Sequence, residues 1–191
     1  MSEHGFHVHG PHDHEAEHAA RHEPDGLAGQ LAVTTAIIAT IGALFAYMGG
    51  ATQADAGLYK NNAAIKKTEA ADQWNFYQAK GNKQNLAELA SDLVPEPRRS
   101  FYASEAKRYD GEKAKIMADA KKLEEESRDW DRRSEEQLHQ HHRWAQATTA
   151  LQIAIAMAAI AILTRRRWLE YGVFALSGIG IVLGGLAWRH I

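Results

Sequence analysis

Histidines gather at the N-terminal end of the sequence, where they alternate with aspartate and glutamate. Imidazole and carboxylate groups together are good ligands for zinc, nickel and copper. No folded scaffold is expected to hold these ligands, so we predict adventitious zinc or nickel binding on this tail and no resident cofactor. The metal-ligating candidates are His4, His7, His9, His12, His14, His18 and His22.

Five residues of this tail, His14-Glu15-Ala16-Glu17-His18, also fit the H-E-x-x-H pattern of zinc metalloproteases. Such a site needs its helix beside a substrate cleft, with a third ligand held in place. A short polar tail before an apolar segment supplies neither, so we predict no catalytic residue. A second group, His139, His141 and His142, precedes another apolar segment. We expect these three histidines to form the polar end of a helix. The alternative is a cluster that responds to pH or metal.

The composition of the 191 residues excludes several classes of protein. The chain has no cysteine, which excludes a disulfide framework, a thiolate zinc site, an iron–sulfur cluster and a cysteine nucleophile. Its formal net charge of -2 removes the usual electrostatic case for nucleic acid. Neither a P-loop nor a G-x-S-x-G motif is present. We therefore predict a protein that is not an enzyme and does not bind nucleic acid.

Three long uncharged segments, 27–50, 144–164 and 171–188, follow the tail 1–26. About 20 apolar residues cross a bilayer as a helix, so each segment is long enough to span one. The tail is acidic rather than basic, which argues against a signal peptide. We predict three transmembrane helices and contact with membrane lipid.

The highly charged region 51–143 separates the first two predicted spans. Its strong helix breaker is the Val94-Pro95-Glu96-Pro97 string, which leaves two arms of similar length. Two such arms predict a long extramembrane helical hairpin with its tip at 95–97. The fold class is therefore all-α, an integral membrane protein with a coiled-coil-like hairpin.

Heptad spacing indicates which faces of the two arms pack together. The second arm carries Tyr102, Tyr109, Ile116, Leu123 and Trp130, with Ala106, Ala120, Ser127 and Ser134 following at small-residue positions. The first arm keeps a weaker heptad, interrupted by Asp72, at Leu58, Ile65, Ala79, Leu86 and Leu93. Folding about residue 96 predicts that Leu86 faces Ala106, Leu89 faces Ala103 and Phe76 faces Ile116.

Arginines in the short loop 165–170 determine the expected topology, because the positive-inside rule weights short loops. Arg165, Arg166 and Arg167 predict a cytoplasmic loop, a cytoplasmic N-terminus and a periplasmic hairpin. Arg143 and other arginines at the hairpin end of the second span oppose this orientation. We expect a multi-pass protein of the bacterial inner membrane.

The string Ala71-Asp72-Gln73-Trp74-Asn75-Phe76-Tyr77-Gln78-Ala79-Lys80, together with Leu163-Thr164-Arg165-Arg166-Arg167-Trp168, is the most distinctive part of the sequence. With these motifs the region from Leu27 to Trp188 resembles a bacterial family of small membrane proteins known only as a domain of unknown function. The resemblance implies the same helical architecture and brings no activity, cofactor or catalytic residue. The histidine-rich tail departs from that pattern.

Aromatic residues and small-residue pairs suggest self-association. A two-helix layer cannot enclose all of its aromatic side chains, and glycine pairs allow helices to approach closely in a bilayer. The predicted oligomer interface comprises Trp74, Tyr77, Tyr102, Tyr109, Trp130, Gly180 and Gly184. We predict a homo-oligomeric membrane scaffold that organises the envelope, with an unidentified protein partner at the hairpin as a further expectation. The alternatives are a metal-homeostasis accessory that uses the tail, and a channel or transporter component lined by Thr148, Thr149 and Gln152.

Overall fold

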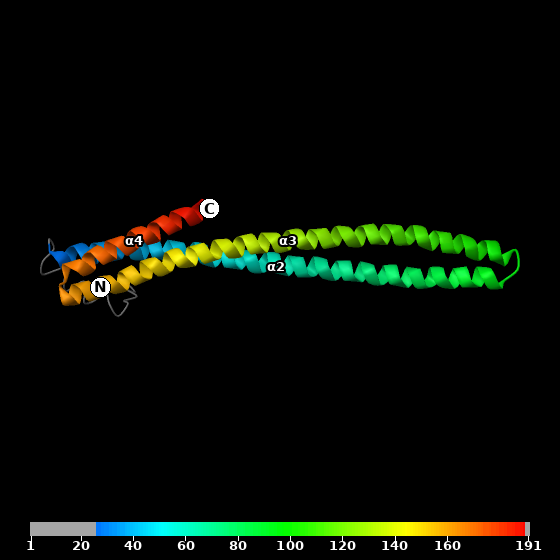
Figure 1. The fold of residues 1–191 in the computed structure, drawn as a ribbon, viewed down its shortest axis with the longest axis horizontal. Helices are drawn as coiled ribbons and strands as arrows, with labels where there is room; N and C mark the ends of the chain where they lie inside the picture. Colours follow the sequence, from blue (N-terminus) through cyan, green and yellow to red (C-terminus); the bar gives the residue numbers. More distant parts are fainter. Residues whose placement is uncertain (1–25, 190–191) are drawn as a thin grey trace, which may run out of the picture. The chain divides into compact units, whose positions relative to one another are not determined.

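The computed structural model describes residues 26–189, and every regular element in this range is an α-helix (Figure 1). Helix α2 covers Leu27–Leu93, α3 covers Arg98–Thr164 and α4 covers Arg167–Trp188. The predicted all-α class with three long helices is confirmed. The helices form two compact units. Among the described residues, 54–137 form one unit, the hairpin, and 26–53 together with 138–189 form the other, the three-helix unit.

Helices α2 and α3 are each 67 residues long and contribute to both units. The sequence divisions between apolar and charged segments, at 50/51 and 143/144, are therefore not helix ends. A helix does not end because hydropathy changes. It ends where the backbone cannot continue, and the chain has no proline between Pro24 and Pro95.

The hairpin turns over residues 94–97, between the end of α2 and the start of α3. Pro95 and Pro97 lack the N–H groups that would continue a helical ladder. The Ser100 hydroxyl donates to the Pro97 carbonyl oxygen at 2.8 Å, and Arg99 Nε donates to the Ser91 carbonyl oxygen at 3.3 Å. The Arg99 contact satisfies one of the carbonyl groups that the end of α2 leaves without a helical partner, and the Ser100 contact fixes the start of α3 to the turn.

Small residues line the seam between α2 and α3 in the hairpin. Ala56, Ala63 and Ala70 recur every seven residues on α2 and are buried, as are Ala120 and Ser134 on α3. Side chains of this size let two helices approach more closely than leucine would allow. The five heptad residues of α3 from Tyr102 to Trp130 border this seam, and their side chains are half-buried.

Two serine hydroxyls cross the seam at this short separation. Ser127 Oγ donates to the Ala63 carbonyl oxygen and Ser134 Oγ donates to the Ala56 carbonyl oxygen, both at 2.8 Å. Seven residues separate the two serines and seven separate their acceptors, so both hydrogen bonds fit the same register of α2 against α3. The register of the two arms thus depends on main-chain contacts that only small residues permit.

The predicted packing face of α2 is wrong. Leu58, Ile65, Leu86 and Leu93 are exposed, and the seam uses the alanines two residues before Leu58 and Ile65. The predicted partners of Phe76, Leu86 and Leu89 are also wrong, because all three side chains are exposed. Large side chains in the seam would separate the helices and break the serine bonds, so they lie outside it.

The three-helix unit contains two small apolar clusters. Leu31 of α2 packs with Ala158 and Ala161 of α3 and with Leu169 and Val173 of α4. A second cluster comprises Ile38, Leu151 and Ala154. The inner positions of α3 are therefore mainly alanine.

A two-residue connection joins α3 to α4. Arg165 has a φ of 50°, in the left-handed region that few residues other than glycine adopt. Arg166 is extended and caps α4 without a side-chain hydrogen bond. This conformation reverses the chain within the minimum length.

The seam predicts unequal effects for two neighbouring alanines. We expect Ala63→Leu to destabilise the hairpin by about 1–3 kcal/mol, because overpacking forces the helices apart. Ala64→Leu, at an exposed position, should change stability little. Thermal unfolding of the full chain, followed by circular dichroism, measures both. Equal melting temperatures for the two variants would contradict the close-packed seam.

Candidate functional site

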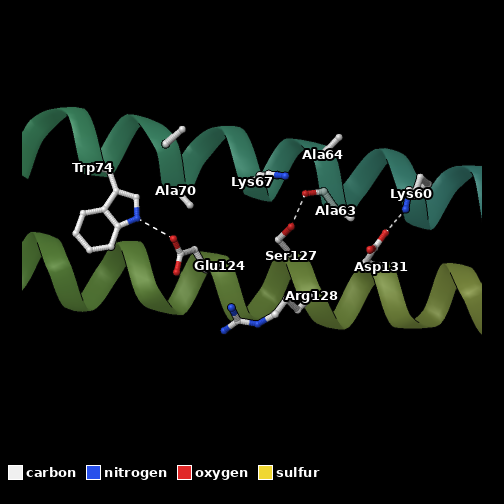
Figure 2. Close-up of a pocket in the computed structure, with 11 residues that line it drawn as sticks. Lys60, Ala63, Ala64, Lys67, Ala70, Trp74, Glu124, Ser127, Arg128 and Asp131 are labelled. Carbon is white, nitrogen blue, oxygen red and sulfur yellow. Dashed lines mark hydrogen bonds and ion pairs between the residues drawn. The ribbon is translucent and has the colours of Figure 1, made fainter.

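A half-open groove runs between α2 and α3 in the hairpin and has a volume of about 670 Å³ (Figure 2). Alanines from α2 line much of it, namely Ala63, Ala64, Ala70 and Ala71. Trp74 lies at one end of the groove and the Lys60–Asp131 pair lies at the other. Its size is within the range of ligand-binding cavities.

Polar contacts between the helices hold the two ends of the groove. Trp74 Nε1 donates to Glu124 Oε1 at 2.8 Å, and Lys60 pairs with Asp131. The Asp131 carboxylate raises the pKa of Lys60 by accepting its hydrogen bond and by its charge. The ring of Trp74 also meets Tyr77 edge to face, with centroids 5.6 Å apart. Trp74 is thus held by its own chain, in the distinctive string identified from the sequence.

Lys67 and Arg128 also line the groove, one from each helix. Within residues 26–189 neither forms an ion pair, whereas both groove carboxylates already have partners. Two such cations beside an alanine wall can attract an anion. The groove holds no histidine or cysteine and offers binding chemistry rather than an activated nucleophile.

A charge cluster forms on the hairpin where Arg108 contacts two carboxylates. Arg108 Nη2 lies 2.5 Å from Glu105 Oε2 and its Nη1 lies 2.8 Å from Glu112 Oε1. Lys80 approaches Glu112 to 2.5 Å across the seam. A hydrogen bond from Lys80, with nearby positive charge, lowers the pKa of Glu112, and Arg108 lowers that of Glu105 in the same way. These exposed contacts add modestly to the register.

The predicted interface aromatics of the hairpin have partners in the same chain. The ring of Tyr109 lies under Arg108 at 4.6 Å, and that of Tyr77 under Lys113 at 5.0 Å. Trp130 packs on Tyr59 with centroids 5.5 Å apart. Tyr102 meets Phe101 edge to face. With Trp74, all five are half-buried, so the hairpin itself accounts for much of their packing.

Gly180 and Gly184 of α4 are buried against other helices of the three-helix unit. A Cβ on Gly180 would lie 2.5 Å from Leu151 Cδ2 and 3.3 Å from the Ala147 carbonyl oxygen. A Cβ on Gly184 would overlap the ring of Phe45. Both glycines therefore allow close packing inside one chain. Contacts with a second copy are not needed to explain them.

The three-helix unit contains a buried polar layer that the sequence analysis missed. Trp144 is 2% exposed, and its Nε1 has no hydrogen-bond partner in the described structure. His141 Nδ1 lies 2.8 Å from the Gly49 carbonyl oxygen, and Gln140 bonds to the carbonyl of Ala187. The signal in the sequence was a tryptophan and a glutamine four residues apart at the edge of an apolar segment.

The other predicted site residues are separate from the groove. His139 and His142 are exposed, and the described residues contain no group of three or more metal-ligating side chains. Arg165, Arg166 and Arg167 are exposed at the connection between α3 and α4. The seven candidate ligands of the N-terminal tail lie outside the described residues.

Replacing Trp144 separates ring packing from the unpaired donor. Trp144→Ala should cost about 3–5 kcal/mol because it leaves a large cavity. Trp144→Phe keeps most ring contacts and removes a buried N–H that lacks a partner, so its loss should be much smaller. Melting temperatures of the detergent-solubilised chain measure this difference. Equal losses would show that Trp144 Nε1 has a hydrogen-bond partner in solution.

Comparisons with known proteins identify a family and no closer relative. No curated protein and no solved structure matches the chain. Residues 27–190, which include α2, α3 and α4, match the family described as "Domain of unknown function (DUF4337)". Because this match covers most of the chain, the protein belongs to the DUF4337 family.

Proposed function

We propose that this protein is a self-associating scaffold of the bacterial inner membrane, with three transmembrane helices and an extramembrane hairpin. The role is structural rather than enzymatic, and its partners are lipid, further copies of the chain and a protein that contacts the hairpin. The observation that carries the proposal is the distribution of apolar side chains in the three-helix unit.

Many large apolar side chains of this unit face outward, and a few large ones, such as Leu31, Leu151 and Trp144, lie inside among alanines. Exposed residues include Val33, Ile37, Leu44, Ile153, Ile160, Phe174, Ile179 and Val182. The interior is rich in alanine and glycine. A water-soluble bundle would not expose so many large apolar side chains, whereas lipid solvates them and helices in lipid pack closely through small residues. All three helices are also long and apolar enough to cross a membrane.

Polar side chains at outward positions fit the same environment. Thr149 and Thr164 donate their hydroxyl groups to carbonyl oxygens one turn back, both at 2.8 Å. In lipid such bonds satisfy hydroxyl groups that water cannot reach. Thr148 does the same toward Trp144 at 2.9 Å, so these hydroxyls offer little lining for a channel. The scaffold is therefore favoured over the channel component.

The orientation we propose places the hairpin in the periplasm and the N-terminus in the cytoplasm. Arg165 and Arg166 form a two-residue connection and Arg167 begins α4, and positive charge in so short a connection best predicts the cytoplasmic side. A reporter that fluoresces only in the cytoplasm should stay dark when inserted at Glu96 in the hairpin turn and fluoresce when inserted at Arg166. The opposite pattern would reverse the topology.

Self-association should raise the measured mass of the particle above that of one chain. We expect the full chain in nanodiscs or mild detergent to form a defined homo-oligomer at micromolar concentration, measured by native mass spectrometry or light scattering. Circular dichroism checks that the hairpin stays helical. A monodisperse monomer with full helix content would overturn the scaffold and leave a hairpin that serves a different protein.

A further inference from the structure

Positive charge is concentrated in the three-helix unit. Its described residues contain five arginines and a single carboxylate, Glu170, whereas cationic and acidic side chains nearly balance in the hairpin. Three of the five arginines, Arg165, Arg166 and Arg167, are consecutive and exposed, and we call them the arginine triplet. A cluster of one sign of charge attracts a partner of the opposite sign.

No carboxylate of the described chain neutralises the arginine triplet. Glu170 lies three residues after Arg167 on α4, a spacing that allows an ion pair, yet neither residue forms one within residues 26–189. Arginines of the hairpin differ, since Arg108 and Arg132 each contact two carboxylates on the same helix. The triplet can therefore bind a ligand from outside this part of the chain.

Exposed tryptophans near both ends of α4 indicate the depth of the triplet in a membrane. Trp168 directly follows the triplet and is 63% exposed, and Trp188 ends the helix and is 69% exposed. They lie 20 residues apart, which corresponds to a helical rise of about 30 Å, the thickness of the hydrocarbon core of a bilayer. Tyr171, 72% exposed, lies close to Trp168 in the sequence. Tryptophan and tyrosine prefer the headgroup level, so the triplet lies at the level of the lipid phosphates.

The chemistry of arginine favours a phosphodiester group as its ligand. A guanidinium group presents N–H donors in a planar fork, from which two phosphate oxygens can accept at once. In a zwitterionic headgroup a second, cationic group competes with arginine for the phosphate. An anionic phospholipid carries no such competitor, so a cluster of arginines prefers it.

We propose that the arginine triplet binds the headgroup of an anionic phospholipid, such as phosphatidylglycerol, in the leaflet at the α3–α4 connection. Trp168 and Tyr171 border this site at the level of the headgroups. The inference deepens the proposed function and rests on it, because it requires the three helices to span a bilayer.

The opposite end of the three-helix unit is less basic. Gln140 bonds to the carbonyl of Ala187 there, and the exposed arginines nearby are Arg143 of α3 and Arg189, which follows α4. These two cations belong to different helices, whereas the triplet places three on consecutive residues. Anionic lipid is therefore bound mainly in one leaflet, and each copy of the scaffold gathers such lipid around its α3–α4 connection.

Counting bound lipids tests this site. Full-length protein in mild detergent is titrated with phosphatidylglycerol or phosphatidylcholine, and native mass spectrometry counts the lipids that stay bound. We expect about tenfold tighter binding of phosphatidylglycerol. R165Q/R166Q/R167Q should abolish most of this preference, and R165K/R166K/R167K should lose part of it, because lysine keeps the charge without the planar fork. An unchanged preference in the glutamine variant would overturn the proposed site.

Two control variants separate the triplet from total charge. K107Q/K115Q/K121Q removes three exposed cations of the hairpin, and R143Q/R189Q removes the arginines at the opposite end of the three-helix unit. Both should retain most of the preference for phosphatidylglycerol. A loss in either control as large as in R165Q/R166Q/R167Q would show that the preference follows total charge, and would overturn the site at the connection.

Two other anions could occupy the triplet, and each has its own test. Inorganic phosphate should not displace phosphatidylglycerol any more than sodium chloride of equal ionic strength does. E15Q/E17Q/E23Q/D25N, which neutralises acidic residues of the N-terminal tail, should bind lipid as the natural chain does. Displacement by phosphate would identify a soluble ligand, and a preference seen only in the tail variant would identify the tail. Either result would overturn this inference.

Vesicles distinguish this inference from the proposed function. The chain should insert into vesicles of phosphatidylcholine alone and resist carbonate extraction, because insertion depends on its apolar helices. An inserted oligomer without any preference for phosphatidylglycerol would overturn this inference and leave the proposed scaffold. A chain that carbonate extracts from every vesicle tested would overturn both.

Discussion

Close approach of α2 and α3 is the constraint on which the hairpin depends. Ser127 and Ser134 can reach main-chain carbonyl oxygens of α2 only because alanine occupies the facing positions. Once that separation is set, the register follows, and it brings Trp74 to Glu124 and Lys60 to Asp131. The groove exists because small side chains leave space beside the seam. The outward position of every large aliphatic side chain of α2 in the hairpin follows from the same constraint.

The three-helix unit applies the same packing principle in a different setting. Gly180 and Gly184 admit the side chains of Leu151 and Phe45 at distances that no other residue would allow. Many large aliphatic residues of the unit consequently point outward, which fits the lipid environment that we propose for it. In the hairpin the same arrangement leaves large apolar residues of α2 exposed among charged ones. One packing rule thus leaves large apolar side chains exposed in both units.

Aromatic residues illustrate where sequence reasoning stops. Their number on the two arms suggested more apolar surface than one seam could bury, and five of them, two on α2 and three on α3, were therefore assigned to an interface between subunits. The structure gives each of these rings a neighbour on the hairpin, through cations over Tyr77 and Tyr109 and ring contacts at Tyr102 and Trp130. These contacts join a ring to a cation, to an adjacent ring or to a ring distant in sequence, and apolar periodicity detects none of these three kinds of partner.

The sequence by itself determined the helical class, the three apolar segments and the place where Pro95 and Pro97 turn the chain, because these depend on local hydropathy and on backbone chemistry. It also identified the heptad of α3. Only the tertiary structure decided which face of α2 forms the seam. Alanines and large aliphatic residues of α2 both recur every seven residues, and which set is buried depends on the distance between the two helices. The buried layer at Trp144, Gln140 and His141 was likewise invisible, because its partners are main-chain carbonyls of other helices.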